Sequence, residues 1–110
     1  MKTKPLDKQL IMDVLEYEPY TGNLIWKEQL SFRAQIGSIA GTTDRQGYKQ
    51  VGIKGRTIKL GRIVWFLNTG EDIGDRVIHY KDRNLSNNRI ENLEVVSRKE
   101  LALMRIYKGR

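Results

Sequence analysis

Residues 78–93 read IHYKDRNLSNNRIENL, an asparagine-rich stretch set between two short apolar segments. The apolar segments, residues 76–80 and 93–96, have the length and composition of short strands. Asparagine tolerates a left-handed backbone and hydrogen-bonds its own main chain, so the stretch between them is predicted to be a loop. Ser97 and Glu100 then give the S-x-x-E pattern that begins a helix. The sequence therefore predicts strand, long loop, strand and helix.

A β-hairpin followed by a helix is predicted before this unit. Apolar and polar residues alternate on both sides of a Lys54-Gly55 turn. From Leu60 onward the apolar residues change to helical spacing and end at Gly70, which can close a helix. The alternating positions are Val51, Ile53, Ile58 and Leu60, and the helical stripe is Leu60, Ile63, Val64 and Leu67.

The N-terminal part is predicted to begin with a helix, because apolar residues recur at helical spacing from Leu6 to Leu15. Asp7 can cap the start of this helix. A short strand over residues 24–27 follows, and residues 28–44 are predicted to be a loop with short extended pieces. Trp26 and Trp65 are expected in the core, and Asn87 and Asn88 are expected to hold their own loop.

The composition fits one small globular protein. Hydrophobic residues make up 39% of the 110 residues, which is enough for a compact core. We therefore predict a single unit over residues 1–110, with residues 1–70 and 71–110 as its two parts. The absence of cysteine excludes disulfides and thiolate metal sites. No apolar run of about 18 residues and no apolar signal core occur, so we expect a protein that is neither exported nor membrane-bound.

The net charge of +7 is concentrated in the C-terminal part of the chain. Residues 1–44 carry five Lys/Arg and six Asp/Glu, whereas residues 45–110 carry fifteen and seven. This excess predicts attraction to a polyanion such as nucleic acid. A solvated basic surface accounts for the charge equally well, so nucleic acid needs independent support.

The pattern N-N-R-I-x-N-L at residues 87–93, between two strands and before a capped helix, closely resembles the HNH endonucleases of the phage homing type. In those enzymes this unit is the ββα-metal motif. The hairpin and helix over residues 47–70 resemble the segment that precedes the motif, and residues 17–26 resemble the family's N-terminal segment. The resemblance implies an α+β fold, with a small antiparallel sheet and packed helices followed by a ββα-metal-like unit. It also implies double-stranded DNA as the partner.

The residues that the family uses for catalysis are mostly replaced. In the family an Asp-His pair on the first strand supplies a metal ligand and the general base. An Asn orients that His, and an Asn or His on the final helix completes the metal site. By the N-N-R-I-E-N-L anchor, the Asp position is His79, the His position is Tyr80 and the orienting Asn is present as Asn92. The helix ligand position is Leu101, and a further His position, where the hairpin enters the helix, is Gly61.

These replacements predict the loss of cleavage by the family mechanism. An unperturbed tyrosine has a pKa of about 10, too high for a general base, and leucine offers no lone pair to Mg²⁺ or Mn²⁺. No metal ion is therefore expected, and His79 is the ligand if one binds. A base and a metal ligand could still be restored by His79 and Glu100, because Glu100 follows His79 by 21 positions, the same separation as Tyr80 to Leu101. However, a one-residue shift turns a strand side chain to the other face and rotates a helix side chain by about 100°.

The sequence is thus interpreted as an HNH-like, DNA-binding protein of phage type, catalytically inactive and acting in the cytoplasm of an infected bacterium. Two alternatives stay open. One is an active nicking endonuclease with a rewired site that uses Mg²⁺ or Mn²⁺, and the other is a phage inhibitor that binds a host protein. The basic side chains predicted to contact DNA are Lys49, Lys54, Arg56, Lys59, Arg62, Lys81, Arg83 and Arg89.

Overall fold

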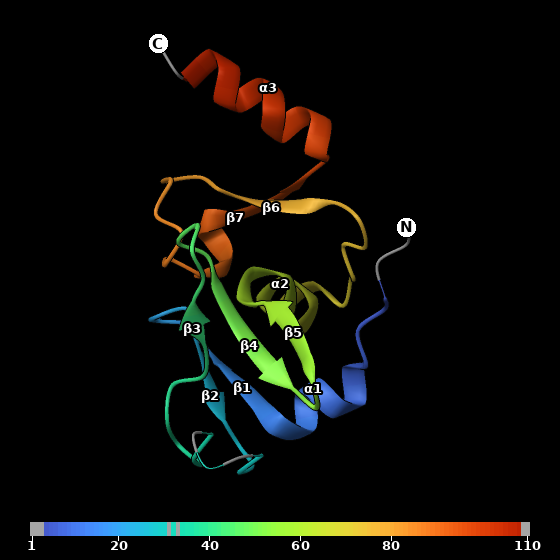
Figure 1. Cartoon of the computed structure of the whole chain (residues 1–110), viewed down its shortest axis with the longest axis vertical. Coiled ribbons are helices and arrows are strands. Elements are labelled where there is room, and N and C mark those ends of the chain that lie inside the picture. The colour runs from blue at the N-terminus through green and yellow to red at the C-terminus, as the bar shows by residue number, and fades with distance from the viewer. Residues whose placement is uncertain (1–3, 31, 33, 109–110) are drawn as a thin grey trace.

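The computed structural model describes residues 4–30, 32 and 34–108, with side chains up to residue 104, and Figure 1 shows the arrangement. The elements are α1 (Lys8–Val14), β1 (Leu15–Glu18), β2 (Asn23–Trp26), β3 (Thr42–Thr43), β4 (Lys49–Ile53), β5 (Arg56–Lys59), α2 (Leu60–Thr69), β6 (Val77–Tyr80), the 3-10 helix η1 (Ile90–Asn92), β7 (Leu93–Val96) and α3 (Arg98–Lys108). Strands pair antiparallel as β1–β2, β3–β4–β5 and β6–β7. The predicted α+β fold is confirmed.

The first helix is shorter than predicted. Asp7 caps α1 as expected, since its Oδ1 accepts a main-chain N–H of the first turn at 3.1 Å. The prediction of helix at Leu15 is wrong, because α1 ends at Val14 and Leu15 begins β1. Over so few residues the helical and the alternating patterns place similar side chains inward. Pairing with β2 favours the strand here, because Leu15 lies opposite Trp26 and both side chains are buried.

The hairpin β4–β5 and helix α2 form where the sequence predicts them. Lys54 and Gly55 make the turn with φ angles of 48° and 79°, the left-handed conformation that a tight two-residue hairpin uses. Leu60, which continued the strand alternation in the sequence, is instead the first residue of α2. The helix closes at Gly70, whose φ is 78° and whose N–H donates to the Phe66 carbonyl at 2.8 Å.

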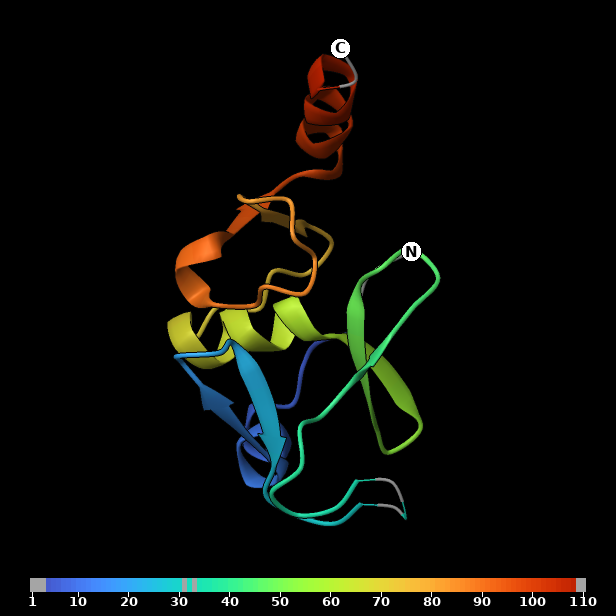
Figure 2. The same ribbon diagram turned by 90° about the vertical axis from the view of Figure 1, so that its left-hand side faces the viewer.

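Helix α2 lies at the centre of the fold (Figure 2). Its Ile63 and Val64 are completely buried, and it packs against α1, β4, β5, β6 and η1. Trp26 is buried in this core as predicted. Trp65 is partly buried, and its indole N–H donates to Glu71 at 3.1 Å. Both the N-terminal elements and the C-terminal strands are therefore positioned by the same helix.

Helix α3 begins with the predicted capping box and then leaves the body of the molecule (Figure 1). The Glu100 N–H donates to Ser97 Oγ at 3.0 Å, and the Ser97 N–H donates to Glu100 Oε1 at 2.8 Å. Leu101 and Met104 are half-buried, because β6 is the main element against which α3 packs. Neither α3 nor any other helix in the described part of the chain is long and apolar enough to cross a membrane.

The turn between β1 and β2 packs directly on the asparagine-rich loop. The Tyr17 hydroxyl donates to the Asn88 carbonyl at 3.1 Å and accepts the Ile90 N–H at 2.9 Å. Gly22 lies so close that a Cβ there would be 2.5 Å from the main-chain nitrogen of Arg89. Its φ of 77° is also in the left-handed region. A glycine is therefore required at this contact both for space and for backbone conformation.

We expect Gly22→Ala to destabilise the fold by about 2 kcal/mol or more, because the new methyl group overlaps main-chain atoms at a left-handed φ. Gly52→Ala on β4 is the matched control, since a Cβ there meets nothing within 4 Å. It should equal or exceed the wild type by up to about 1 kcal/mol. Chemical denaturation measures both variants, and equal stabilities would contradict the packing described.

Candidate functional site

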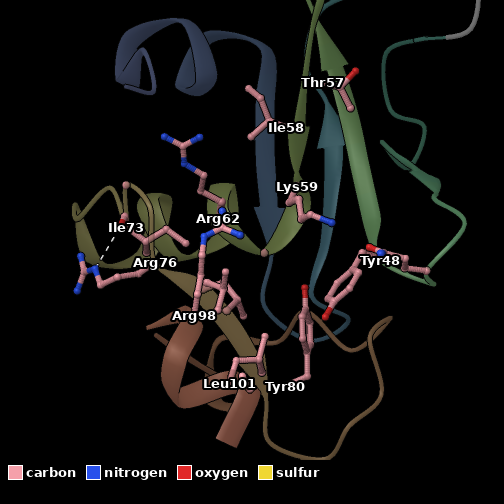
Figure 3. A pocket seen from close by; sticks show the side chains of 16 residues that line it. Tyr48, Thr57, Ile58, Lys59, Arg62, Ile73, Arg76, Tyr80, Arg98 and Leu101 are labelled. Carbon is pink, nitrogen blue, oxygen red and sulfur yellow. Dashed lines mark hydrogen bonds between the residues drawn. The ribbon is translucent and has the colours of Figure 1, made fainter. Parts of the chain in front are cut away.

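A cleft of about 460 Å³ lies between the hairpin with the start of α2 on one side and β6 with α3 on the other (Figure 3). Gly61, Tyr80 and Leu101 all line it, so the fold brings these three positions together. The rest of the wall combines apolar and basic side chains, and no carboxylate of the described residues is among its lining groups. The basic members are Lys59, Arg62, Arg76 and Arg98.

Tyr80 lies in this cleft as a buried hydrogen-bond donor. Alternation along β6 turns it inward, and its side chain is only 4% exposed. Its hydroxyl donates to Asn88 Oδ1 at 2.8 Å, and the centroids of the Tyr80 and Tyr48 rings are 6.2 Å apart. Burial, with a smaller contribution from Tyr48, raises the pKa of Tyr80 above its ordinary value. The phenol therefore stays protonated and is already committed to an amide oxygen.

Gly61 leaves the space that the Tyr80 hydroxyl fills. A Cβ at position 61 would lie 2.6 Å from Tyr80 Oη and 3.5 Å from Asn88 Oδ1. Position 61 is in the first turn of α2, so its backbone does not require glycine. A larger residue at position 61 and the phenol at position 80 therefore exclude each other sterically.

His79 points away from the core, on the opposite face of β6 from Tyr80. Its Nδ1 lies 3.3 Å from Oε1 of Glu94, which is its cross-strand partner on β7. With Leu101 and Arg83 it also lines a smaller hollow beside the cleft. Sequence spacing left open a pairing of His79 with Glu100, but the Glu100 carboxylate instead accepts the Ser97 N–H in the helix cap. The partner of His79 is therefore a glutamate that sequence spacing did not single out.

Asn92 is buried, but its side chain makes its hydrogen bonds to the loop and not to Tyr80. Its Nδ2 donates to Asp82 Oδ1 and to the Asn87 carbonyl, both at 2.9 Å, and its Oδ1 accepts the Asp82 N–H at 2.9 Å. Hydrogen bonds to the Asp82 carboxylate, the largest of them from Asn87, lower its pKa. The residue that contacts Tyr80 is Asn88. Sequence reasoning assigned Asn88 to the loop, as observed, but missed this contact, which only the packing of β6 on the loop creates.

The side chains at these positions do not fit a divalent metal ion. Leu101 presents hydrocarbon where the family has a ligand, and Tyr80 keeps its proton. Among the described residues, no three His, Asp or Glu side chains are grouped so that they could hold an ion. At the positions predicted from sequence for a base and a helix ligand, the site therefore offers hydrogen bonding and apolar packing.

Three of the arginines predicted to contact DNA are bound within the protein. Arg56 donates to main-chain carbonyls of the N-terminal segment. The Nε of Arg62 lies 2.9 Å from Asp72 Oδ1, and the side chain is 11% exposed. Arg89 is exposed but donates to the Tyr20 carbonyl at 2.6 Å. These contacts join distant segments of the chain, and the sequence alone gives no sign of them.

The other predicted basic residues lie at the surface. Lys54, Lys81 and Arg83 are exposed, and Lys49 is half-buried at the start of β4. Arg83 has a φ of 64°, which is uncommon for a residue with a side chain. The hydrogen bonds around Asp82 and Asn92 hold the loop that presents it. The loop therefore fixes the backbone position from which the Arg83 side chain extends.

The cleft wall has a further basic edge. Lys59 Nζ lies 3.2 Å from Asp44 Oδ2 and 4.2 Å from the centroid of the Tyr48 ring. Arg76 and Arg98, which were not predicted as site residues, stand on the opposite side (Figure 3). Their positions in the sequence could have identified them as site residues, because Arg76 directly precedes β6 and Arg98 is one helical turn before Leu101 on α3.

Two comparisons with known proteins bear on the strand–loop–strand–helix unit and on the fold around it. Residues 59–103 match the profile of the HNH endonuclease family. The fold is similar to a solved structure that describes DNA binding and cleavage by the HNH homing endonuclease I-HmuI, with a TM-score of 0.61 and 22% identity. The alignment covers 87% of this chain and 53% of that one, so this chain spans about half the length of I-HmuI. No curated protein sequence matches.

We expect Tyr80→Phe to cost about 1–3 kcal/mol of folding stability, because Asn88 Oδ1 loses its donor inside the core. Tyr20→Phe is the matched control, since Tyr20 is 88% exposed, and its effect should be near zero. Urea denaturation of the three proteins measures the difference. A Tyr80→Phe protein as stable as the wild type would mean that the Tyr80–Asn88 bond contributes nothing.

The same bond predicts a loss of stability in alkali. Because burial raises the pKa of Tyr80, the folded protein keeps the phenol protonated where the unfolded chain releases its proton. The contribution of this group to stability is therefore complete below about pH 10 and decreases as the pH rises above it. Denaturation from pH 8 to 11 should show the advantage of wild type over Tyr80→Phe shrinking above pH 10. Parallel curves would contradict the assignment.

Proposed function

We propose that this chain is an HNH-like protein that binds double-stranded DNA and does not cut it. The observation that carries the proposal is the Tyr80 hydroxyl, which is buried and donates to Asn88 at the place of the family's general base. A general base must be free to accept a proton near the working pH. A phenol whose pKa burial raises, and whose proton already serves an amide oxygen, does not meet that requirement.

The second requirement for phosphodiester hydrolysis in this scaffold is a cation at the developing charge. Leu101 lines the cleft beside Tyr80 and has no atom that can bind a cation. Losing the base and a ligand removes two separate contributions to the rate, each worth orders of magnitude. Restoring only one of them would therefore not restore cleavage, and we expect no resident metal ion.

Binding DNA requires exposed basic side chains but, unlike cleavage, neither a general base nor a metal ion. Exposed Lys81 and Arg83 stand on the loop beside the site, and Arg76 and Arg98 stand at the cleft. Such side chains contact phosphates, which positions a protein on a duplex without reading its sequence. Arg62 is left out of this proposed interface because its side chain, paired with Asp72, is only 11% exposed, whereas that of Arg76, paired with Glu71, is 45% exposed. The positive balance of residues 45–110 supports the same surface.

The resemblance to the phage homing type extends the proposal to the biological setting. We infer a phage-type protein that acts in the cytoplasm of an infected bacterium. A protein that binds a site without cutting it can occupy that site and block other proteins from it. This role follows from the resemblance together with the Tyr80 and Leu101 replacements.

One observation favours a second candidate, an active nicking enzyme with a rewired site. His79 and Glu94 form a pair at 3.3 Å, and Arg83 lines the same hollow as His79. A carboxylate that orients a histidine beside an arginine is an arrangement used for proton transfer near phosphate. On this reading His79 is the base and Glu94 orients it.

Supercoiled plasmid separates the two candidates. The proposal predicts that it stays supercoiled with Mg²⁺ or Mn²⁺, while a gel shift with the same DNA weakens as salt rises. Conversion to open circles by the wild type, abolished in His79→Ala, would establish the second candidate instead. The absence of any gel shift would remove DNA binding and favour a host-protein partner.

Two surface variants test the binding face. Lys81→Ala and Arg83→Asn, the latter chosen because asparagine tolerates the left-handed backbone at position 83, should each weaken binding. Each should lower the slope of log K against log salt by about 1, the value for one phosphate contact. Lys8→Ala, an exposed lysine on α1, is the control and should leave the slope unchanged. Unchanged slopes in both test variants would contradict this placement of the DNA.

A further inference from the structure

The cleft between the hairpin and α3 combines two kinds of surface. Ile58, Ile73 and Ile78 line it and are each more than nine-tenths buried, so its deep part is apolar. Leu101 and Ala102 continue this apolar surface onto α3. Lysine and arginine side chains stand around it, and no carboxylate of the described residues lines it. Its volume of about 460 Å³ lies within the range of about 300–1,000 Å³ that small-molecule sites have.

A double helix does not account for the apolar part of this cleft. The outer surface of a duplex consists largely of phosphates and sugars, which basic side chains contact, whereas its bases are stacked inside. Phosphate contacts therefore explain the basic side chains and leave the apolar surface without an occupant. A ligand that uses both surfaces joins a flat, largely apolar ring to an anionic group.

Arg98 is the cation of the cleft best suited to receive that anionic group. The other three cations each pair with a carboxylate, namely Lys59, Arg62 and Arg76. Arg98 forms no ion pair with the described residues, and its Nε donates to the Asp75 carbonyl at 3.2 Å. In Figure 3 its side chain extends from α3 toward α2. A guanidinium that no carboxylate neutralises is well suited to a phosphate, which it can bind through two N–H groups.

We propose that this cleft binds a single unpaired nucleotide, with the base on the apolar surface and the phosphate at Arg98, an inference that rests on the proposed loss of the catalytic groups. Leu101 then has a positive role, because its hydrocarbon packs on a base although it offers no ligand to a metal ion. The nucleotide comes from one of two sources. It is either a free nucleoside monophosphate or a nucleotide outside the stack of a bound duplex, and both present the same groups to the cleft.

Nitrogen–proton correlation spectra of the whole chain test the free source. The four deoxynucleoside monophosphates are titrated, with their nucleosides and inorganic phosphate as the two halves of the ligand. At least one monophosphate should shift the amide signals of Ile78, Leu101 and Ala102 and bind 10-fold or more tighter than either half. Arg98→Gln should reduce the affinity for the monophosphate to that for the nucleoside, because the phosphate loses its cation.

Duplexes with one extrahelical nucleotide test the second source. The wild type should bind them 10-fold or more tighter than the matched duplex. An abasic residue at the extra position should remove this gain, because it keeps the phosphate and lacks the base. Ala102→Trp, which adds a large side chain to the cleft from an exposed position on α3, should also remove the gain and bind the matched duplex as wild type. Leu103→Trp is the matched control, since Leu103 is exposed on the same helix and does not line the cleft.

The outcomes distinguish this inference from the proposed function. The expected result in either arm supports the inference and identifies the source of the nucleotide. If no monophosphate binds tighter than inorganic phosphate and the extrahelical nucleotide gives no gain, the inference is wrong. It is equally wrong if folded Ala102→Trp keeps the wild-type behaviour in both arms. Retention of the matched duplex in these cases leaves the proposed DNA binding standing, whereas a chain that binds nucleotides but no matched duplex contradicts the proposed function alone.

Discussion

The hydrogen bond from the Tyr80 hydroxyl to the Asn88 amide holds the asparagine-rich loop against β6 at the centre of the ββα unit. Asn88 is almost completely buried, and its carbonyl accepts the Tyr17 hydroxyl, so one residue connects β6, the asparagine-rich loop and β1. Gly61 on α2 leaves the space for this contact. Such a buried polar network stabilises a fold only when every member is paired. That condition holds, since every buried side-chain nitrogen and oxygen of the described residues has a partner.

We propose that this network keeps the fold intact while the catalytic groups of the HNH family are replaced. A catalytic base needs a free lone pair and access to water, whereas a structural donor needs burial and a fixed partner. Tyr80 satisfies the second set of needs and not the first, and Leu101 extends the apolar wall beside it. The residues proposed to contact DNA are exposed and lie outside the core. Stability and binding therefore depend on different residues.

Local signals in the sequence predicted much of this structure, and long-range contacts account for what it missed. The bounds of β7 and the Ser97–Glu100 cap follow from residues next to each other in the chain. The positions of Tyr80 and Leu101 followed from the family resemblance, and the fold brings them into one cleft. By contrast, the Asn92–Asp82 and Arg62–Asp72 contacts form only when a loop closes or a helix end packs on another segment. Periodicity and spacing carry no information on such partners, so their roles became apparent only in the fold.

We propose that a protonated tyrosine has taken the place of a base and metal centre. Manganese titration followed by nitrogen–proton correlation spectra of the chain, alone and on a DNA duplex, tests it most directly, because Mn²⁺ broadens signals close to where it binds. We expect Mn²⁺ to broaden the amide signals of residues 79–80 and 100–102 no more than those of other surface residues. Selective loss of the His79, Glu94 and Leu101 signals at low Mn²⁺ would place an ion between β6, β7 and α3 and contradict the account.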